Sequence, residues 1–238
     1  MAPVTELLSL TLKPDLPAAE AAAILDTTAA TLVAQPGCLR VRTARTHEDP
    51  HAVRVFVDWE NVAAHRAFEK TEAYAPFKAR VRDAVAAPPQ RPYHVEFDPF
   101  PVSALQNGTT TTTANGTVSS KTPVAEVLHM WFPGDYTDEQ RARAEASARE
   151  FVGKMEGFAE GLTGEWSIGW SVERDIEREG APSSVLVGIL GWVSVEAHMK
   201  ARDHPEFAKN IPLLRDIEGL RGFDMKHVST TTVEAGNK

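Results

Sequence analysis

The chain has one cysteine, Cys38, among its 238 residues. A single thiol cannot form an internal disulfide and has no partner for a cysteine-based zinc site. Basic residues are outnumbered, because 25 Lys and Arg stand against 33 Asp and Glu and give a formal net charge of −8. An acidic chain is poorly suited to bind nucleic acid or an anionic membrane surface, so the sequence predicts neither as a partner.

Long apolar runs are also lacking. No stretch approaches the roughly eighteen apolar residues of a membrane-spanning helix, and the first residues have neither the basic region nor the apolar core of a secretory signal. We therefore expect a soluble, cytoplasmic protein. A Gly-rich phosphate loop, an HExxH helix and a Cys/His cluster with metal spacing are missing too. The sequence thus predicts no cofactor and no metal site.

One segment, residues 99–122, has almost no charge and contains a run of five threonines from Thr109 to Thr113. Such a composition buries too little apolar surface to offset the entropy of ordering the chain. We predict a flexible Thr/Gly/Asn-rich linker here. It separates a first domain at 1–98 from a second at 123–231, which a disordered tail at 232–238 follows.

The two domains repeat each other. A shift of 133 residues (192 − 59) superimposes the two sequences at several tryptophan and histidine positions. Smaller shifts apply nearer the start of each copy, as a few loop insertions would produce. The matched positions are Trp59/Trp192, Ala64/Ala197, His65/His198, Tyr74/Phe207, His94/His227, Glu6/Glu126 and Gly37/Gly164. Such self-similarity indicates an internal duplication.

Each copy shows the same order of expected elements. Apolar patterns predict strands at 6–12, 39–45, 52–59 and 92–97 in the first copy, and at 124–132, 165–173, 185–192 and 225–231 in the second. Helical patterns follow the first and third strand of each copy. Thr137 with Gln140 predicts a capping box, and Pro212 is expected to bend the last helix. The resulting β-α-β-β-α-β order is ferredoxin-like, an α+β fold with helices on one face of an antiparallel sheet.

Helices are expected on only one face of each sheet, so the other apolar face must pack against another part of the protein. We therefore expect the two repeats to pack sheet to sheet as an intramolecular pseudo-dimer, and we leave open a further homodimer of whole chains.

Residues 192–207 read WVSVEAHMKARDHPEF. This stretch resembles the W-x-S-x-E-A-H…F signature of the antibiotic biosynthesis monooxygenase (ABM) domain, which belongs to the dimeric α/β-barrel superfamily. Residues 59–74 resemble it more weakly, with Asn61 for the serine and Ala63 for the glutamate. The resemblance implies tandem ABM domains that form one intramolecular dimeric α/β barrel, of a type common in filamentous fungi. The wider group includes cofactor-free oxygenases of aromatic polyketides, haem-degrading enzymes and small-molecule lyases.

Much of this signature has a structural explanation. Asn61 and Ser194 are good N-caps for the helix that follows each tryptophan, and a packed histidine explains His65 and His198. The candidate catalytic residues are His129 and His227. His129 lies in an otherwise apolar strand, where burial favours the neutral imidazole that a general base needs. A core histidine hydrogen-bonded to a carbonyl is the alternative.

Four of the five tryptophans lie in the second copy. Trp166 and Trp170 are four residues apart on one strand and so share a face, as Trp131 does with His129. We predict that these side chains line a flat apolar cavity for an aromatic ligand; simple filling of the core is the alternative. The predicted substrate-binding residues are Trp131, Trp166, Trp170, Trp192 and His94.

The copies differ at Ser9/His129, Leu39/Trp166 and Thr43/Trp170, so a single working site is expected in the second half. The features favour a small-molecule tailoring enzyme of secondary metabolism, a cofactor-free monooxygenase acting on an aromatic or polyketide ligand. A non-oxidative cyclase, isomerase or decarboxylase would use the same base and cavity without oxygen. A non-catalytic ligand-binding or stress-associated protein would have tightly packed interiors, and haem degradation is a further alternative.

Overall fold

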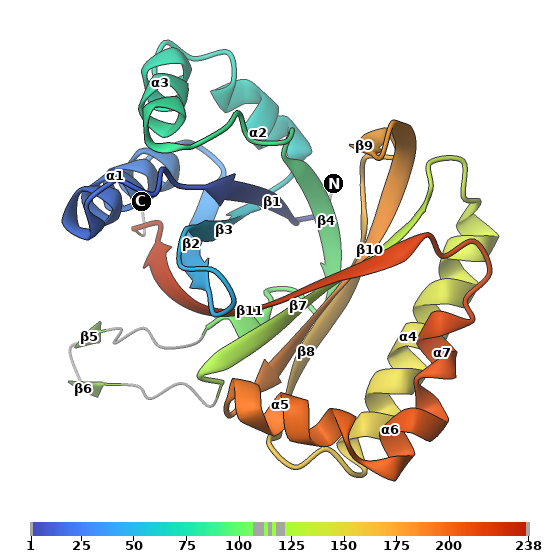
Figure 1. The fold of residues 1–238 in the computed structure, drawn as a ribbon. Helices are drawn as coiled ribbons and strands as arrows, with labels where there is room; N and C mark the ends of the chain where they lie inside the picture. The colour runs from blue at the N-terminus through green and yellow to red at the C-terminus, as the bar shows by residue number, and fades with distance from the viewer. Residues whose placement is uncertain (1, 107–111, 114–115, 118–121, 237–238) are drawn as a thin grey trace. The chain divides into compact units, whose positions relative to one another are not determined.

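The structure is a computed structural model that describes residues 2–106, 112–113, 116–117 and 122–236 (Figure 1). It divides into two compact units. Unit 1 holds residues 1–96 and 230–238, and unit 2 holds residues 97–229. In the described part of the chain, no helix combines the length and the apolar character needed to cross a membrane.

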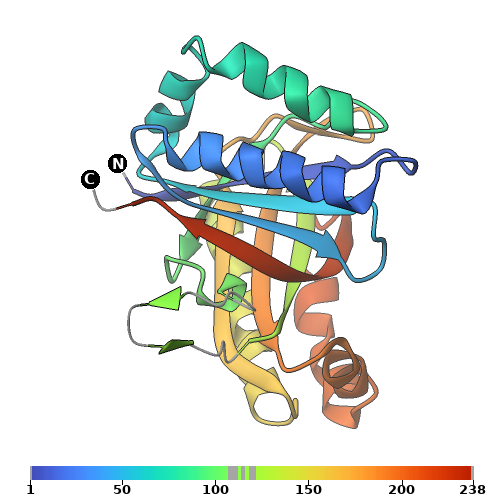
Figure 2. The ribbon, with the colours of Figure 1, turned by 90° about the vertical axis from the view of Figure 1, so that its left-hand side faces the viewer.

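Unit 1 is built around four antiparallel strands in the order β2-β3-β1-β4. Figure 2 shows helix α1 lying across these strands, with α3 beside it. Both helices pack their apolar side chains on the sheet, where Val41, Val53 and Trp59 are fully buried. The elements are β1 (Val4–Thr11), α1 (Ala18–Val33), β2 (Cys38–Thr46), β3 (Ala52–Trp59), α2 (Val62–Phe68), α3 (Tyr74–Ala84) and β4 (Tyr93–Asp98).

Unit 2 repeats this order, because β11-β7-β10-β8 corresponds strand for strand to β4-β1-β3-β2. Helix α4 begins at the predicted capping box, in which Gln140 N donates to the Thr137 hydroxyl. The helix that Pro212 was expected to bend is two helices, α6 and α7. The elements are β7 (Val124–Pro133), α4 (Asp138–Glu156), β8 (Leu162–Ser171), β9 (Ile176–Arg178), β10 (Ala181–Trp192), α5 (Val195–Arg202), α6 (Pro205–Asn210), α7 (Pro212–Arg215) and β11 (Gly222–Glu234).

Both units therefore have the predicted β-α-β-β-α-β order. The α+β class and the two ferredoxin-like repeats are confirmed, and the packing of one sheet on the other stays a prediction. The N-caps at the shared corner are confirmed as well. Asn61 Oδ1 accepts a hydrogen bond from Ala64 N at 3.0 Å, and Ser194 Oγ accepts one from Ala197 N at 3.1 Å.

The segments predicted as a linker and a tail contain some regular structure. The segment expected to be a linker starts with a short 3-10 helix, η1 (Ser103–Leu105), in which Ala104 and Leu105 are fully buried. Further on it forms two short strands, β5 (Thr112–Thr113) and β6 (Gly116–Thr117). The rest of the threonine run falls outside the described residues. At the other end, β11 continues past the predicted boundary at 231 to Glu234.

Two positions of the sequence alignment between the copies are corrected by the structure. Gly37 corresponds to Gly161 and not to Gly164. An added Cβ would lie 2.6 Å from the Ala64 Cβ at Gly37 and 2.7 Å from the Ala197 Cβ at Gly161, whereas Gly164 faces open space. The same close approach of backbone to the Ala64/Ala197 position therefore requires a glycine in each copy.

The register of the second strand changes accordingly. Val41 pairs with Val57, two residues before Trp59, and Trp166 pairs with Leu190, two residues before Trp192. The counterpart of Trp166 is thus Val41 and not Leu39. By the same register, the counterpart of Trp170 is Arg45 and not Thr43.

Candidate functional site

Four buried side chains meet inside unit 2, and we call them the Glu–Trp–His–His cluster. Trp192 Nε1 donates a hydrogen bond to Glu126 Oε2 at 3.0 Å, and His198 Nε2 lies 3.5 Å from the same oxygen. On its other side, His198 Nδ1 lies 2.7 Å from His227 Nε2, so one ring donates to the other. All four residues are at most 7% exposed. The cluster thus forms a continuous polar chain in an apolar interior.

The fold itself brings these residues together. Glu126 and His227 are direct cross-strand partners in the β7–β11 ladder. Trp192 is the last residue of β10, and the Ser194 cap starts α5 two residues later. This corner places the His198 ring against the Trp192 ring, with centroids 4.7 Å apart and planes at 24°. Local backbone geometry therefore fixes the positions of all four groups.

Unit 1 contains the same cluster at the matched positions. Trp59 Nε1 donates to Glu6 Oε2 at 2.9 Å, His65 Nε2 lies 3.6 Å from Glu6 Oε1, and His65 Nδ1 lies 2.8 Å from His94 Nε2. Glu6 and His94 are again cross-strand partners. The residues that agree between the two copies are thus largely this cluster, and its presence in both shows that the repeat uses it as part of its architecture.

Burial changes the charge state of the cluster in unit 2. Desolvation raises the pKa of Glu126 to about 7, although the Trp192 hydrogen bond and the Arg202 charge oppose that rise. Desolvation, together with the neighbouring His227 and Arg202, lowers the pKa of His198 to about 3. At neutral pH the imidazole of His198 is therefore neutral, and the carboxyl group of Glu126 is near its midpoint. A group poised in this way can both accept and return a proton.

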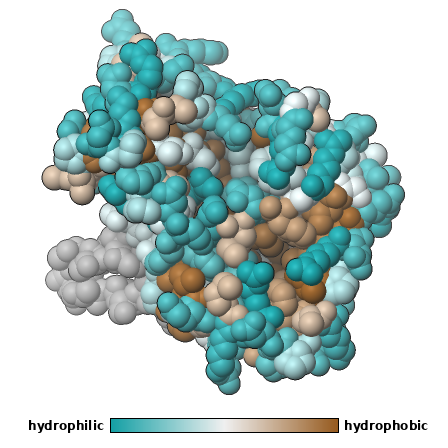
Figure 3. Space-filling view, in the orientation of Figure 1, coloured by the Kyte–Doolittle hydropathy of each residue, from teal (hydrophilic) through white to brown (hydrophobic). Residues whose placement is uncertain are grey.

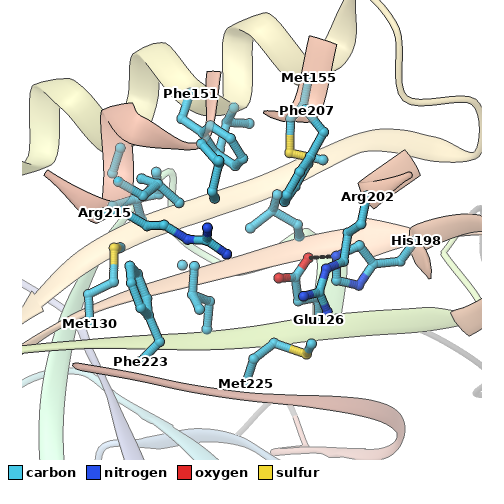
Figure 4. Close-up of a pocket in the computed structure, with 18 residues that line it drawn as sticks. Glu126, Met130, Phe151, Met155, His198, Arg202, Phe207, Arg215, Phe223 and Met225 are labelled. Carbon is cyan, nitrogen blue, oxygen red and sulfur yellow. Dashed lines mark ion pairs between the residues drawn. The ribbon is translucent and has the colours of Figure 1, made fainter. Parts of the chain in front are cut away.

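Glu126 and His198 lie on the wall of a cavity of about 180 Å³ in unit 2 (Figure 4). Strands β7, β8, β10 and β11 form one side of the cavity, and helices α4 to α7 form the other. Most of the wall is apolar, including Met130, Phe151 and Phe207. An engineered apolar cavity of about 150 Å³ admits benzene, so this cavity is large enough for at least one ring. Figure 3 shows apolar side chains around a hollow, where Figure 1 shows β11 and α7.

Two arginines complete the polar part of the wall. Arg202 is the last residue of α5 and Arg215 the last residue of α7. Figure 4 shows Arg202 next to Glu126 and His198, and Arg215 reaching into the cavity from the opposite side. Among the described residues, no set of three or more His, Cys, Asp or Glu side chains is placed to hold a metal ion. The cavity thus offers a carboxyl group, a neutral imidazole and two cations around an apolar space.

Three of the predicted site residues belong to the two clusters. His227 and Trp192 are in unit 2, where both contact His198 directly. His94 is in unit 1, where it contacts His65. None of the three lines the cavity of unit 2, but His227 and Trp192 both contact His198, which does.

The other predicted residues lie elsewhere in unit 2. His129 and Trp131 stack on each other with centroids 6.1 Å apart, on the face of β7 opposite to Met130 and the cavity. Trp166 and Trp170 share the helix-covered face of β8, as predicted, and pack against the core beneath α4. There Trp166 Nε1 donates to Glu156 Oε1 at 2.9 Å, and Trp170 Nε1 donates to the Arg141 carbonyl at 3.3 Å. The structure does not bring the four tryptophans of unit 2 around one cavity.

Sequence reasoning missed Glu126 and the arginines as site residues. One signal for Glu126 was present, since an acidic residue in the apolar strand VAEVLHMWF recurs as Glu6 in the first copy. A carboxyl group inside an apolar strand is costly unless it is paired or functional. The arginines carry no comparable signal, because both lie in polar helix ends.

Comparison with known proteins finds one matching family and solved structures with a similar fold. Residues 3–80 match the model of the antibiotic biosynthesis monooxygenase family. No curated protein matches the chain in sequence. A crystal structure of an anthrone oxidase-like protein is 12% identical with a TM-score of 0.67, and the match covers 100% of this chain and 95% of that one.

Two bacterial structures match over a similar extent. A candidate monooxygenase of Fusobacterium nucleatum is 11% identical with a TM-score of 0.57, covering 100% of this chain and 96% of that one. A candidate monooxygenase of Lactobacillus acidophilus is 12% identical with a TM-score of 0.55, covering 99% and 98%. At these identities the likeness shows a shared fold along the whole chain.

Proposed function

From the match of residues 3–80 to the antibiotic biosynthesis monooxygenase family, we propose that this tandem-repeat chain is a cofactor-independent oxygenase of a small aromatic or polyketide-derived substrate in secondary metabolism. The proposal depends on the carboxyl group of Glu126. This group faces an apolar cavity, and its pKa is about 7. The name of the anthrone oxidase-like protein with the same fold supports this class of reaction.

The reaction needs a base and molecular oxygen. Glu126 takes the proton of a phenolic or enolic substrate, or of its acidic methylene group, and leaves an electron-rich carbanion in the water-poor cavity. The anion reduces oxygen and forms a carbon–oxygen bond, which gives a peroxide anion. Glu126 then returns its proton to the peroxide. Loss of water leaves a carbonyl group, so one oxygen atom enters the product, and the other leaves as water with both methylene hydrogens.

Turnover with a defined substrate tests this reaction. We expect the metal-free protein to convert an anthrone-type substrate under air, with one oxygen consumed per quinone formed. Incorporation of one labelled oxygen atom from ¹⁸O₂ would identify an oxygenase. The buffer without protein serves as the control. Equal rates with and without the protein would contradict the proposal. Turnover that persists without oxygen would identify a cyclase, isomerase or decarboxylase instead.

The pH dependence of turnover follows from the pKa of Glu126. A carboxyl group accepts a proton only when it is ionised, so kcat/KM should rise with pH and level off above a midpoint near 7. His198, with its pKa lowered to about 3, should contribute no transition in this range. Rates measured between about pH 5 and about pH 9 test this expectation. A profile that is flat across this range would exclude Glu126 as the base.

A further inference from the structure

Arg215 differs from Arg141, Arg149 and Arg178 of unit 2 in its contacts. Arg141 and Arg178 lie over tryptophan rings, with 4.7 Å and 4.8 Å from guanidinium carbon to ring centroid, and Arg149 pairs with Glu145 at 2.8 Å. The side chain of Arg215 has no hydrogen bond, ion pair or ring contact within the described part of the chain, and only its backbone N–H donates, to the Ile211 carbonyl at 3.0 Å. Its guanidinium group nevertheless lines the cavity (Figure 4). A cation held at an apolar cavity without a counterion is available to a ligand.

The duplication supplies an internal comparison. The shift of 133 residues (215 − 82) places Arg215 on Arg82. Arg82 lies in the continuous helix α3, its side chain is 74% exposed, and it pairs with Asp83 at 3.6 Å. In unit 2 the matching helix is interrupted before Pro212, where α7 begins. The interruption sets the direction of α7 independently of α6, and Arg215 ends on the cavity wall. Arg215 is an exposed residue as well, but its guanidinium group borders the cavity of unit 2 (Figure 4).

The opposite side of the cavity carries the base. Glu126 and His198 come from β7 and α5, whereas Arg215 comes from α7, and Figure 4 shows the apolar space between them. A guanidinium group binds a planar carboxylate through two parallel hydrogen bonds. A ligand that spans the space would therefore place an anionic group at one end and an acidic hydrogen at the other.

We propose that Arg215 is the specificity-determining residue of the cavity, and that the substrate is a ring-sized carboxylate whose anionic group binds Arg215 while its reactive end meets Glu126. The apolar wall surrounds the ring between the two. This inference rests on the proposed function only in taking the cavity as the substrate site, and it can be tested without turnover.

Equilibrium binding of benzoate and of its neutral analogue benzamide tests the proposal. Benzoate should bind the full chain roughly ten- to hundredfold more tightly than benzamide, which is the range of a charge-assisted hydrogen-bonded contact. Arg215→Met should remove that difference and leave benzamide affinity unchanged, and Arg215→Lys should restore part of it. Arg82→Met is the matched control and should change neither affinity.

Each result separates the two proposals. Equal affinities of the two probes for the wild-type chain, or a benzoate preference that survives Arg215→Met, would overturn this inference and leave the oxygenase proposal standing. A preference that depends on Arg215, together with failure to consume oxygen with any substrate, would support a carboxylate site and remove the oxygenase proposal. Loss of benzoate binding in Arg82→Met as strongly as in Arg215→Met would also overturn the assignment.

Discussion

Replacing Glu126 with glutamine is expected to lower kcat/KM by about 10²–10⁴-fold, the usual contribution of a general base. The amide has nearly the same size, and its oxygen can still accept the hydrogen bond that Trp192 Nε1 donates at 3.0 Å. What the variant loses is a group that takes and returns a proton. The remaining activity should no longer show the rise of kcat/KM around pH 7 that the pKa of Glu126 produces.

Glu6→Gln is the matched control, because Glu6 makes the same contacts in unit 1. Trp59 Nε1 donates to it at 2.9 Å, and His65 Nε2 lies 3.6 Å away. The two variants should therefore change the melting temperature similarly, while only Glu126→Gln should change the rate by more than about twofold. Equal loss of activity in both variants would assign the two clusters a shared structural role. Full activity of Glu126→Gln would exclude Glu126 as the base.

The architecture of each repeat was predictable because local patterns and the duplication agree. The Asn61 and Ser194 caps and the Thr137 capping box depend on short-range backbone hydrogen bonds, which the sequence specifies directly. The recurrence of glutamate, tryptophan and histidine at matching positions revealed the duplication, but it did not show that these side chains contact one another. Elements whose geometry depends on contacts within a few residues were therefore predicted at the correct positions.

The cavity was not predictable, because β7 is apolar on both faces. Ten residues from Val124 to Pro133 are buried or partly buried throughout, so alternation does not reveal which side the helices cover. His129 and Trp131 therefore appeared as good candidates as any residue of the strand, yet they share the face opposite to the cavity. Pro212 predicted a bend in the last helix, but not that the bend would bring Arg215 to the cavity wall.

Register shifts explain the two corrected alignments. The ladders are irregular between Cys38 and Arg40 in unit 1, and between Leu190 and Trp192 in unit 2. Such irregularities shift the pairing of two strands by one residue, and the amino-acid composition does not reveal them. Two glycines three residues apart, Gly161 and Gly164, both adopt positive φ angles of 90° and 77°. Only the contact with Ala197 distinguishes the glycine that matches Gly37.

The difference between a cavity and a filled core also involves one strand position. Gly188 faces the cavity of unit 2 opposite Leu128, and the same register in unit 1 places Val55 opposite Leu8. Val55 is 3% exposed and belongs to the core of its unit. A missing side chain at Gly188 therefore leaves space where the other repeat has a valine.

Gly188→Val is consequently expected to close the cavity. An added Cβ would meet Leu190 Cδ1 at 3.5 Å and Ile168 Cγ1 at 4.0 Å, which are ordinary contacts that the strand can accept. Benzoate binding should weaken at least tenfold, and kcat/KM should fall by about 10²-fold or more, because displacement of a substrate by about 1 Å has an effect of that size. Gly188→Ala should lie between wild type and valine in both measurements.

Stability should change in the opposite direction. Valine fills apolar space and favours the strand conformation more than glycine does, so the melting temperature of Gly188→Val should rise. The reciprocal change, Val55→Gly, removes a buried side chain and should cost about 2 kcal/mol or more of unfolding free energy without affecting turnover at Glu126. A Gly188→Val protein that is less stable and binds benzoate unchanged would show that the cavity beside Gly188 does not hold the ligand. If stability rises while binding and turnover fall, the exchange of one side chain between the repeats accounts for the confinement of the site to unit 2.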